Sequence, residues 1–211
     1  GVLMELVAEP IEAYLRNLVG SKHAAQDAME ALAQERDFPI VGPCVGSLLE
    51  VLAKSIDARR VLELGSGFGY SAFWFARGMP KDGEIIHTDL DAENRQSAQG
   101  FLRDAGFADL MTYAQGNALE VLAQTDGPFD LIFCDIDKID YPKVPDLALG
   151  KLRSGGMLIF DNTLWSGRVL DQDKDADTQA IIDLTQSLYA RTDVTNTLLP
   201  LRDGVLISLK H

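Results

Sequence analysis

Residues 59–71 read "RRVLELGSGFGYS": a short apolar run enters a glycine-rich turn, and a helical pattern follows. Glycine adopts positive φ without strain and lets the backbone approach a ligand closely. A strand, a turn and a helix in this order form the unit from which parallel α/β sheets are built. The stretch therefore predicts an α/β fold with a ligand at the turn.

The same unit recurs along the chain. Further strands are predicted over 83–89, 110–116, 129–135 and 155–161. Helices are predicted over 69–79, 92–105, 117–124, 141–152 and 175–191, and one or two more precede the sheet within 3–35. The final runs "TNTLLPL" and "GVLISLK" flank the turn residues "RDG" (202–204), which indicates an antiparallel hairpin. We expect one doubly wound α/β domain over 1–211, with a helical segment over 1–36 and a Rossmann-like core over 37–211.

Composition narrows the class of partner. The 211 residues carry a formal net charge of −13 at pH 7 and show no basic stripe, which argues against nucleic acid. No apolar run approaches the length of a membrane span, and no secretion pattern opens the chain. Cys44 and Cys134 lie far apart in the sequence, and Cys134 falls inside a predicted strand. A reducing cytoplasm is therefore expected.

The ends of the first three strands indicate a nucleoside-type cofactor. Counted from Gly65, the sixth position is Tyr70, so the dinucleotide fingerprint G-x-G-x-x-G fails. Asp89 ends the second strand, where a carboxylate can accept hydrogen bonds from ribose hydroxyls. Asn117 and Ala118 follow the third strand and would lie near an adenine ring, although a simple helix start explains them almost as well. A plain strand-to-helix turn stays the alternative for the glycines.

The next two strands end in acids. "FDLIFCDIDKIDY" (129–141) delivers Asp135 to a strand end, and "LIFDN" (158–162) delivers Asp161 and Asn162 to the neighbouring one. Two carboxylates about 4 Å apart repel by roughly 4 kcal/mol at an effective dielectric near 20, a cost that a cation would remove. Carboxylate and amide oxygens suit Mg²⁺, and ligand type does not separate it from Mn²⁺ or Ca²⁺. Ordinary turn residues remain the alternative.

These motifs resemble the cation-dependent O-methyltransferases of the catechol and caffeoyl-CoA type, especially their small bacterial members. The resemblance rests on "ELGSGFGYS", "TDLD", "GNALEVL", "FDLIFCDIDKIDY" and "LIFDNTLWSGRV". It implies a seven-stranded methyltransferase sheet of order 3-2-1-4-5-7-6 with the last strand antiparallel, and a homodimer. It also implies that Asp135, Asp161 and Asn162 hold the metal and that Lys138 is the catalytic general base. The implied S-adenosylmethionine-binding residues are Val41, Gly42, Glu63, Gly65, Ser66, Gly67, Gly69, Tyr70, Ser71, Asp89, Leu90, Asn117, Ala118 and Asp135.

The implied activity is methylation of a hydroxyl on a catechol-like small molecule. Two adjacent hydroxyls can chelate the metal, and a desolvated Lys138 can accept the proton. The alternative for Lys138 is a surface lysine paired with Asp137 or Asp140. Trp165 could stack on a flat substrate and Arg168 could meet an anionic tail, or both could belong to a solvated loop.

Three other functions stay open. Some bacterial relatives of this family methylate a hydroxylated wobble uridine in tRNA with the same metal and base, although the acidic charge argues against tRNA. A protein that binds S-adenosylmethionine without catalysis would need neither Lys138 nor the Asp/Asp/Asn set. A metal-independent dehydrogenase is the weakest alternative, because the third glycine of its fingerprint would stand where the chain has Tyr70.

Overall fold

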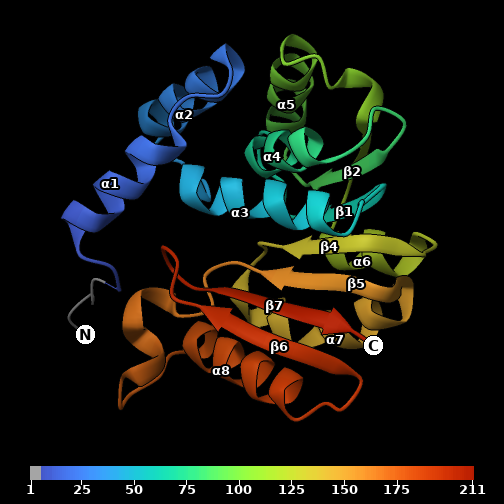
Figure 1. Cartoon of the computed structure of the whole chain (residues 1–211). Helices are drawn as coiled ribbons and strands as arrows, with labels where there is room; N and C mark the ends of the chain where they lie inside the picture. The colour runs from blue at the N-terminus through green and yellow to red at the C-terminus, as the bar shows by residue number, and fades with distance from the viewer. Residues whose placement is uncertain (1–5) are drawn as a thin grey trace.

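The computed structural model describes residues 6–211, in which seven strands form one sheet (Figure 1). The strands are β1 (Arg60–Leu64), β2 (Glu84–Asp89), β3 (Met111–Gln115), β4 (Phe129–Cys134), β5 (Leu152–Phe160), β6 (Val194–Leu199) and β7 (Val205–Lys210). Their order is β3-β2-β1-β4-β5-β7-β6, and β7 is antiparallel to both of its neighbours. The predicted order and the predicted hairpin are both confirmed.

Helices cover both faces of the sheet (Figure 1). The helices are α1 (Glu9–Val19), α2 (Ala24–Arg36), α3 (Gly42–Ser55), α4 (Tyr70–Gly78), α5 (Ala92–Asp104), α6 (Ala118–Gln124), α7 (Val144–Ala148) and α8 (Ala176–Tyr189). Short 3₁₀ helices are η1 (Ala108–Leu110), η2 (Lys138–Lys143), η3 (Leu149–Lys151) and η4 (Trp165–Leu170). Helices α2 to α5 supply the core on one face, and α6 to α8 supply it on the other.

Strand side chains alternate between these two cores. Val61 of β1 and Leu131 of β4 belong to the core that includes α3 and α4, whereas Leu62 and Ile132 belong to the opposite one. A strand that is buried on both faces needs apolar residues at consecutive positions, which is why the strand sequences are nearly continuous apolar runs. This packing fixes the carboxyl ends of the parallel strands at one edge of the sheet.

Two helices differ from the prediction. The sequence analysis predicts no helix over 42–55, yet α3 forms there with a proline in its first turn and packs against α4. The helix predicted over 141–152 is only one short α-helical segment flanked by η2 and η3, because Pro142 and Pro145 lack the amide hydrogens that a continuous helix requires.

Helix α1 lies at the outside of the molecule and has no buried residue (Figure 1). Ile11, Tyr14 and Leu18 are more than half exposed along it. This apolar face is where a dimer contact would lie, and the dimer stays a prediction. No helix within residues 6–211 is long and apolar enough to cross a membrane.

Candidate active site

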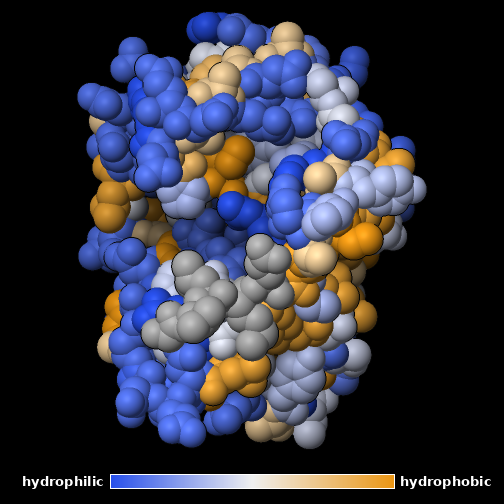
Figure 2. Space-filling model, turned by 90° about the vertical axis from the view of Figure 1, so that its left-hand side faces the viewer, coloured by the Kyte–Doolittle hydropathy of each residue, from blue (hydrophilic) through white to orange (hydrophobic). Residues whose placement is uncertain are grey.

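Three adjoining cavities lie along the carboxyl edge of the sheet. Their volumes are about 560, 280 and 170 Å³, and shared lining residues connect each to the next. Figure 2 looks toward this side of the molecule and shows a hollow with a hydrophilic floor. The two smaller cavities are lined by most of the predicted cofactor residues: Val41, Gly65, Ser66, Gly67, Tyr70, Ser71, Asp89, Leu90, Asn117, Ala118 and Asp135. The largest cavity is lined by Asp135, Lys138, Asp161, Asn162 and Trp165.

The glycine turn between β1 and α4 forms the floor of the second cavity. Gly65 has φ +78, and a Cβ placed on it would lie 2.3 Å from the carbonyl oxygen of Asp135, so only glycine fits there. Gly67 has φ +52 and faces the ring of Phe38. The Gly67 amide donates to Asp89 Oδ2 at 2.8 Å, which ties the turn to the end of β2. The turn is therefore a preformed open cradle, the shape that a nucleoside-type cofactor requires.

Asp89 and Asn117 serve local structure and still face the cavity. Asp89 Oδ1 accepts from the amide of Asp91 at 2.8 Å and from Asn94 at 3.3 Å, while Asp91 caps α5. A carboxylate offers about four acceptor positions and Asp89 already uses three, so about one remains for a ribose hydroxyl. Asn117 caps α6 through Oδ1, which leaves its amide nitrogen for a ligand.

Gly42, Glu63 and Gly69 do not line these three cavities. Gly42 opens α3 and lines a separate cavity of about 220 Å³ beside α1. Gly69 caps α4 with φ +91, and its missing side chain makes room for Ala98 and Leu102 of α5.

Glu63 is fully buried on β1, beneath the glycine turn. Burial raises the pKa of its carboxyl to about 7, and the nearby Ser71 and Ser66 hydroxyls oppose that rise. Neither carboxyl oxygen has a hydrogen-bond partner of good geometry in the described part of the chain. The Glu63 carboxyl is therefore a buried polar group directly under the glycine turn, and no residue among 6–211 hydrogen-bonds to it.

Glu63 should make stability depend on pH. Because its folded-state pKa of about 7 exceeds its usual 4.5, protonation favours the folded state, and stability is lost as pH rises through that window. Between pH 5 and pH 8 this carboxyl should lower the free energy of unfolding of the wild type by roughly 2 to 3 kcal/mol. Glu63→Gln should not show this decrease. Urea unfolding at both pH values measures this, with Glu35→Gln on the exposed surface of α2 as control. Equal pH slopes in wild type and Glu63→Gln would contradict it.

The predicted metal ligands lie together at the ends of β4 and β5. Asp161 is 1 % exposed, and its Oδ1 has no hydrogen-bond partner among residues 6–211. Burial and the negative charge of Asp135 raise the pKa of Asp161 well above its usual range. Asn162 donates its amide hydrogen to Asp203 at 3.3 Å, which turns its oxygen away from that partner.

These observations fit a hard divalent cation, although the donor set is small. Within residues 6–211 there is no cluster of three or more His, Cys, Asp or Glu side chains that could hold a metal. Asp135, Asp161 and Asn162 supply only two carboxylates and one amide oxygen, so they do not form a cluster of that kind. Waters or substrate oxygens would complete the coordination of a cation held by them. The unpartnered buried oxygen of Asp161 is the feature that a cation would satisfy.

Lys138 is a buried lysine at the boundary of the largest and second cavities. Its Nζ donates to Asp135 Oδ1 at 2.8 Å, to the Ile136 carbonyl at 3.1 Å and to the Tyr141 hydroxyl at 2.9 Å. The Tyr141 hydroxyl in turn donates to the carbonyl of Asp161 at 2.9 Å. Asp140 pairs instead with Lys143, so the surface-lysine alternative is not what the structure shows.

The segment after β5 closes the side of the largest cavity. Trp165 lines this cavity, and its ring centroid lies 5.7 Å from Lys138 Nζ. Arg168 does not line it, because η4 bends at Ser166 and Gly167 and directs the guanidinium to an ion pair with Asp175. The structure therefore brings Trp165 to the site and places Arg168 outside it.

Two residues that the sequence analysis treats only as a hairpin turn also reach this cavity. Arg202 and Asp203 belong to the β6–β7 turn and line the largest cavity. Asp203 accepts from the Ser166 amide and from Asn162, which joins the hairpin to the segment after β5. The turn residues "RDG" indicate a hairpin but do not by themselves indicate that it reaches the cavity.

Comparison with known proteins assigns the chain to a family. A family model described as O-methyltransferase matches residues 21–211. The chain belongs to the O-methyltransferase family. A catechol O-methyltransferase of Niastella koreensis is 34% identical over 172 residues, which cover 79% of this chain and 78% of that one.

Solved structures of O-methyltransferases share the fold. TomG from Streptomyces achromogenes, described as involved in tomaymycin synthesis and solved in complex with S-adenosylmethionine, has a TM-score of 0.87 and 32% identity over 95% of this chain and 96% of its own. An O-methyltransferase from Bacillus cereus, solved with S-adenosylhomocysteine, has a TM-score of 0.86 and 27% identity over 95% and 97% of the two chains. In this chain, the two smaller cavities are the place for such a cofactor.

Proposed function

We propose that this O-methyltransferase moves the methyl group of S-adenosylmethionine to one hydroxyl of a vicinal dihydroxy aromatic molecule, with a divalent cation. The observation that carries the proposal is the position of Lys138: its Nζ lies 2.8 Å from Asp135 in the cavity that also holds Asp161, Asn162 and Trp165. An amine, two carboxylates and an aromatic ring at one cavity are the groups that this reaction needs.

The cofactor would occupy the two smaller cavities. The glycine turn leaves room for it, Asp89 would accept from its ribose, and Asn117 and Ala118 would lie beside its adenine. The neighbouring largest cavity would hold the substrate against Trp165. Since Lys138 borders both cavities, its amine lies where donor and acceptor would meet.

In the proposed reaction the substrate oxygen attacks the methyl carbon in line, the carbon–sulfur bond breaks, and its electron pair stays on sulfur. The hydroxyl proton would pass to Nζ of Lys138, which must first release one of the three protons that it donates to Asp135, Ile136 and Tyr141. Asp135, Asp161 and Asn162 would hold the cation, which supplies charge that lowers the pKa of a bound hydroxyl. Burial of Asp161 and Lys138 excludes water and fixes both groups before the substrate arrives.

The first test is methyl transfer from labelled S-adenosylmethionine to 3,4-dihydroxybenzoate, with Mg²⁺ and again with EDTA. We expect label on the phenol with Mg²⁺, none with EDTA, and recovery when Mg²⁺ is restored in excess. Equal transfer with and without EDTA would remove the metal role of Asp135, Asp161 and Asn162. If neither condition gave transfer, simple catechols would be discounted and tRNA would be the next acceptor to test.

A further inference from the structure

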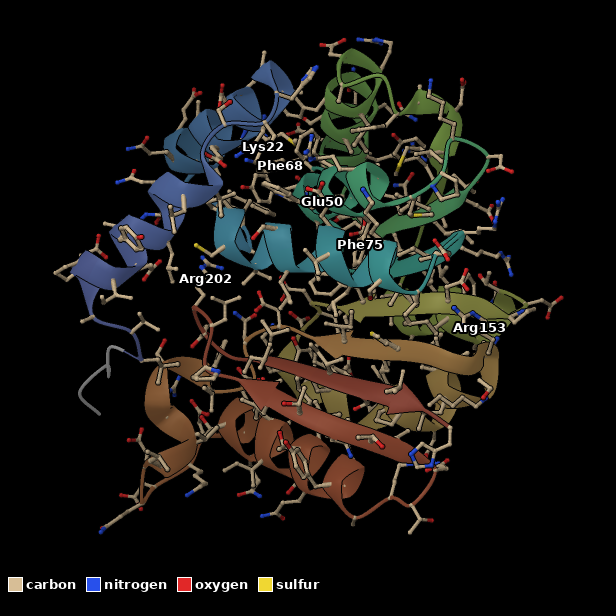
Figure 3. The ribbon with its side chains drawn as sticks, viewed as in Figure 1. Lys22, Glu50, Phe68, Phe75, Arg153 and Arg202 are labelled. Atoms are coloured by element: carbon tan, nitrogen blue, oxygen red, sulfur yellow. The ribbon has the colours of Figure 1, made fainter. Side chains whose placement is uncertain are left out.

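Arg202 presents a cation to the largest cavity, and no residue among 6–211 pairs with it directly. It is half-buried, and its guanidinium makes neither an ion pair nor a hydrogen bond with any of residues 6–211. Figure 3 labels Arg202 between the β6–β7 turn and the beginning of α3, and its Nε would lie 3.8 Å from a Cβ built on Gly42. A half-buried guanidinium without a partner has five donors available to a ligand.

The backbone at Arg202 is also unusual. Its φ is 51°, in the left-handed region that residues with a Cβ rarely adopt. Among residues 6–211, four of the six non-glycine residues with positive φ line the largest cavity: Asn162, Trp165, Ser166 and Arg202. Backbone strain persists where surrounding structure enforces it, and it gathers at functional sites. A glycine would adopt this φ without strain, so an arginine at this position indicates that its side chain has a role at the cavity.

The acids around Arg202 are occupied elsewhere or face the reaction centre. Glu9 and Glu12 of α1 line the same cavity, but both pair with Arg16, at 2.6 and 3.0 Å. Asp203 accepts from the Ser166 amide. The carboxylates of the proposed metal site share the cavity with Arg202 and would be satisfied by the cation. Arg202 is thus left to meet an anion carried by the substrate.

We propose that Arg202 binds a carboxylate on the phenolic substrate and so selects acceptors that carry a negative charge away from the reacting hydroxyls; this rests on the proposed function. A guanidinium matches a carboxylate with two parallel hydrogen bonds. A carboxylate fits better than a phosphate, since the acidic lining would repel a dianion more strongly. Arg202 thereby takes the role that the sequence analysis gives to Arg168.

The test compares two acceptors of nearly equal shape, 3,4-dihydroxybenzoate and the neutral 3,4-dihydroxybenzyl alcohol. The readout is the ratio of their kcat/KM values in wild type, Arg202→Gln, Arg202→Gly and the control Arg103→Gln. We expect both Arg202 variants to lower the preference for the acid by about 10- to 100-fold, mainly through KM. Arg202→Gly should keep the melting temperature or raise it, since glycine adopts this φ freely. Arg103 lies exposed on α5, so its variant should keep the wild-type ratio.

Equilibrium binding of both ligands in the presence of Mg²⁺ and S-adenosylhomocysteine accompanies the kinetics. An unchanged ratio in both Arg202 variants would overturn the proposal, and so would equal losses on both acceptors. Arg168→Gln is measured beside these variants, and a changed ratio in it alone would place the anion at η4 and overturn the proposal too. A wild type that methylated neither acceptor would refute the proposed function, and selective loss of acid binding in Arg202→Gln would still support Arg202.

Discussion

Replacing Lys138 with methionine is expected to lower kcat by about 10²- to 10⁴-fold, the range that a positioned general base contributes. Methionine keeps the apolar stem of the side chain and removes the amine. The amine makes three hydrogen bonds, to Asp135, Ile136 and Tyr141, so its position is fixed before substrate binds. The glycine turn and Asp89 do not depend on it, and affinity for S-adenosylmethionine should therefore stay within about threefold of the wild type.

Single-turnover kinetics and calorimetric binding of the cofactor separate these two effects. Lys143→Met is the matched control, because Lys143 lies in the same 3₁₀ helix and pairs with Asp140 on the surface. The control should retain both turnover and cofactor affinity. Turnover in Lys138→Met that matched the control would remove Lys138 as the base. Loss of cofactor binding would instead indicate that the amine holds Asp135 and the second cavity in place.

The residues of the proposed cofactor site could be brought together from the sequence because their positions depend on local sequence. Gly65 and Asp89 end predicted strands of a parallel sheet and Asn117 follows one, and the carboxyl ends of such strands meet at one edge whatever the distant packing. The same logic placed Asp135 beside Asp161. Knowing where the strands end was therefore sufficient to bring these residues together.

The substrate half depends on long-range topology and was only partly predictable. The β6–β7 turn reaches the site because β7 inserts antiparallel between β5 and β6, which carries Arg202 and Asp203 to the carboxyl edge. Nothing local in "RDG" indicates this position. Likewise, the left-handed backbone at Ser166 and Gly167 turns Arg168 away from the cavity, and a serine gives no local signal of such a bend. Helix α3 was missed because Val41, at its N-cap, offers no side-chain cap and its first turn carries no acid, so Pro43 in the first turn and Lys54 in the last were the only end signals.

Gly65→Ala is expected to lower the free energy of unfolding by roughly 2 to 5 kcal/mol, since it adds steric overlap to backbone strain. The new Cβ would lie 2.3 Å from the Asp135 carbonyl oxygen and 2.9 Å from its carbonyl carbon. These are backbone atoms of the segment that follows β4, so the overlap can be relieved only by moving β1 and β4 apart. That movement displaces Asp135 and the glycine turn together. We therefore expect cofactor affinity to fall at least about tenfold as well.

Two other glycines divide this effect into its parts. Gly106 has φ +80 and open space around its Cβ position, so Gly106→Ala should show the strain alone, about 1 to 2 kcal/mol. Gly100 lies within α5 with open space and no positive φ, so Gly100→Ala should stabilise the protein by about 0.5 to 1 kcal/mol. Urea unfolding of all three variants gives the comparison. A Gly65→Ala cost no larger than that of Gly106→Ala would show that the chain relieves the overlap without strain, and the close approach of β1 and β4 would then not be what requires glycine at the cofactor cradle.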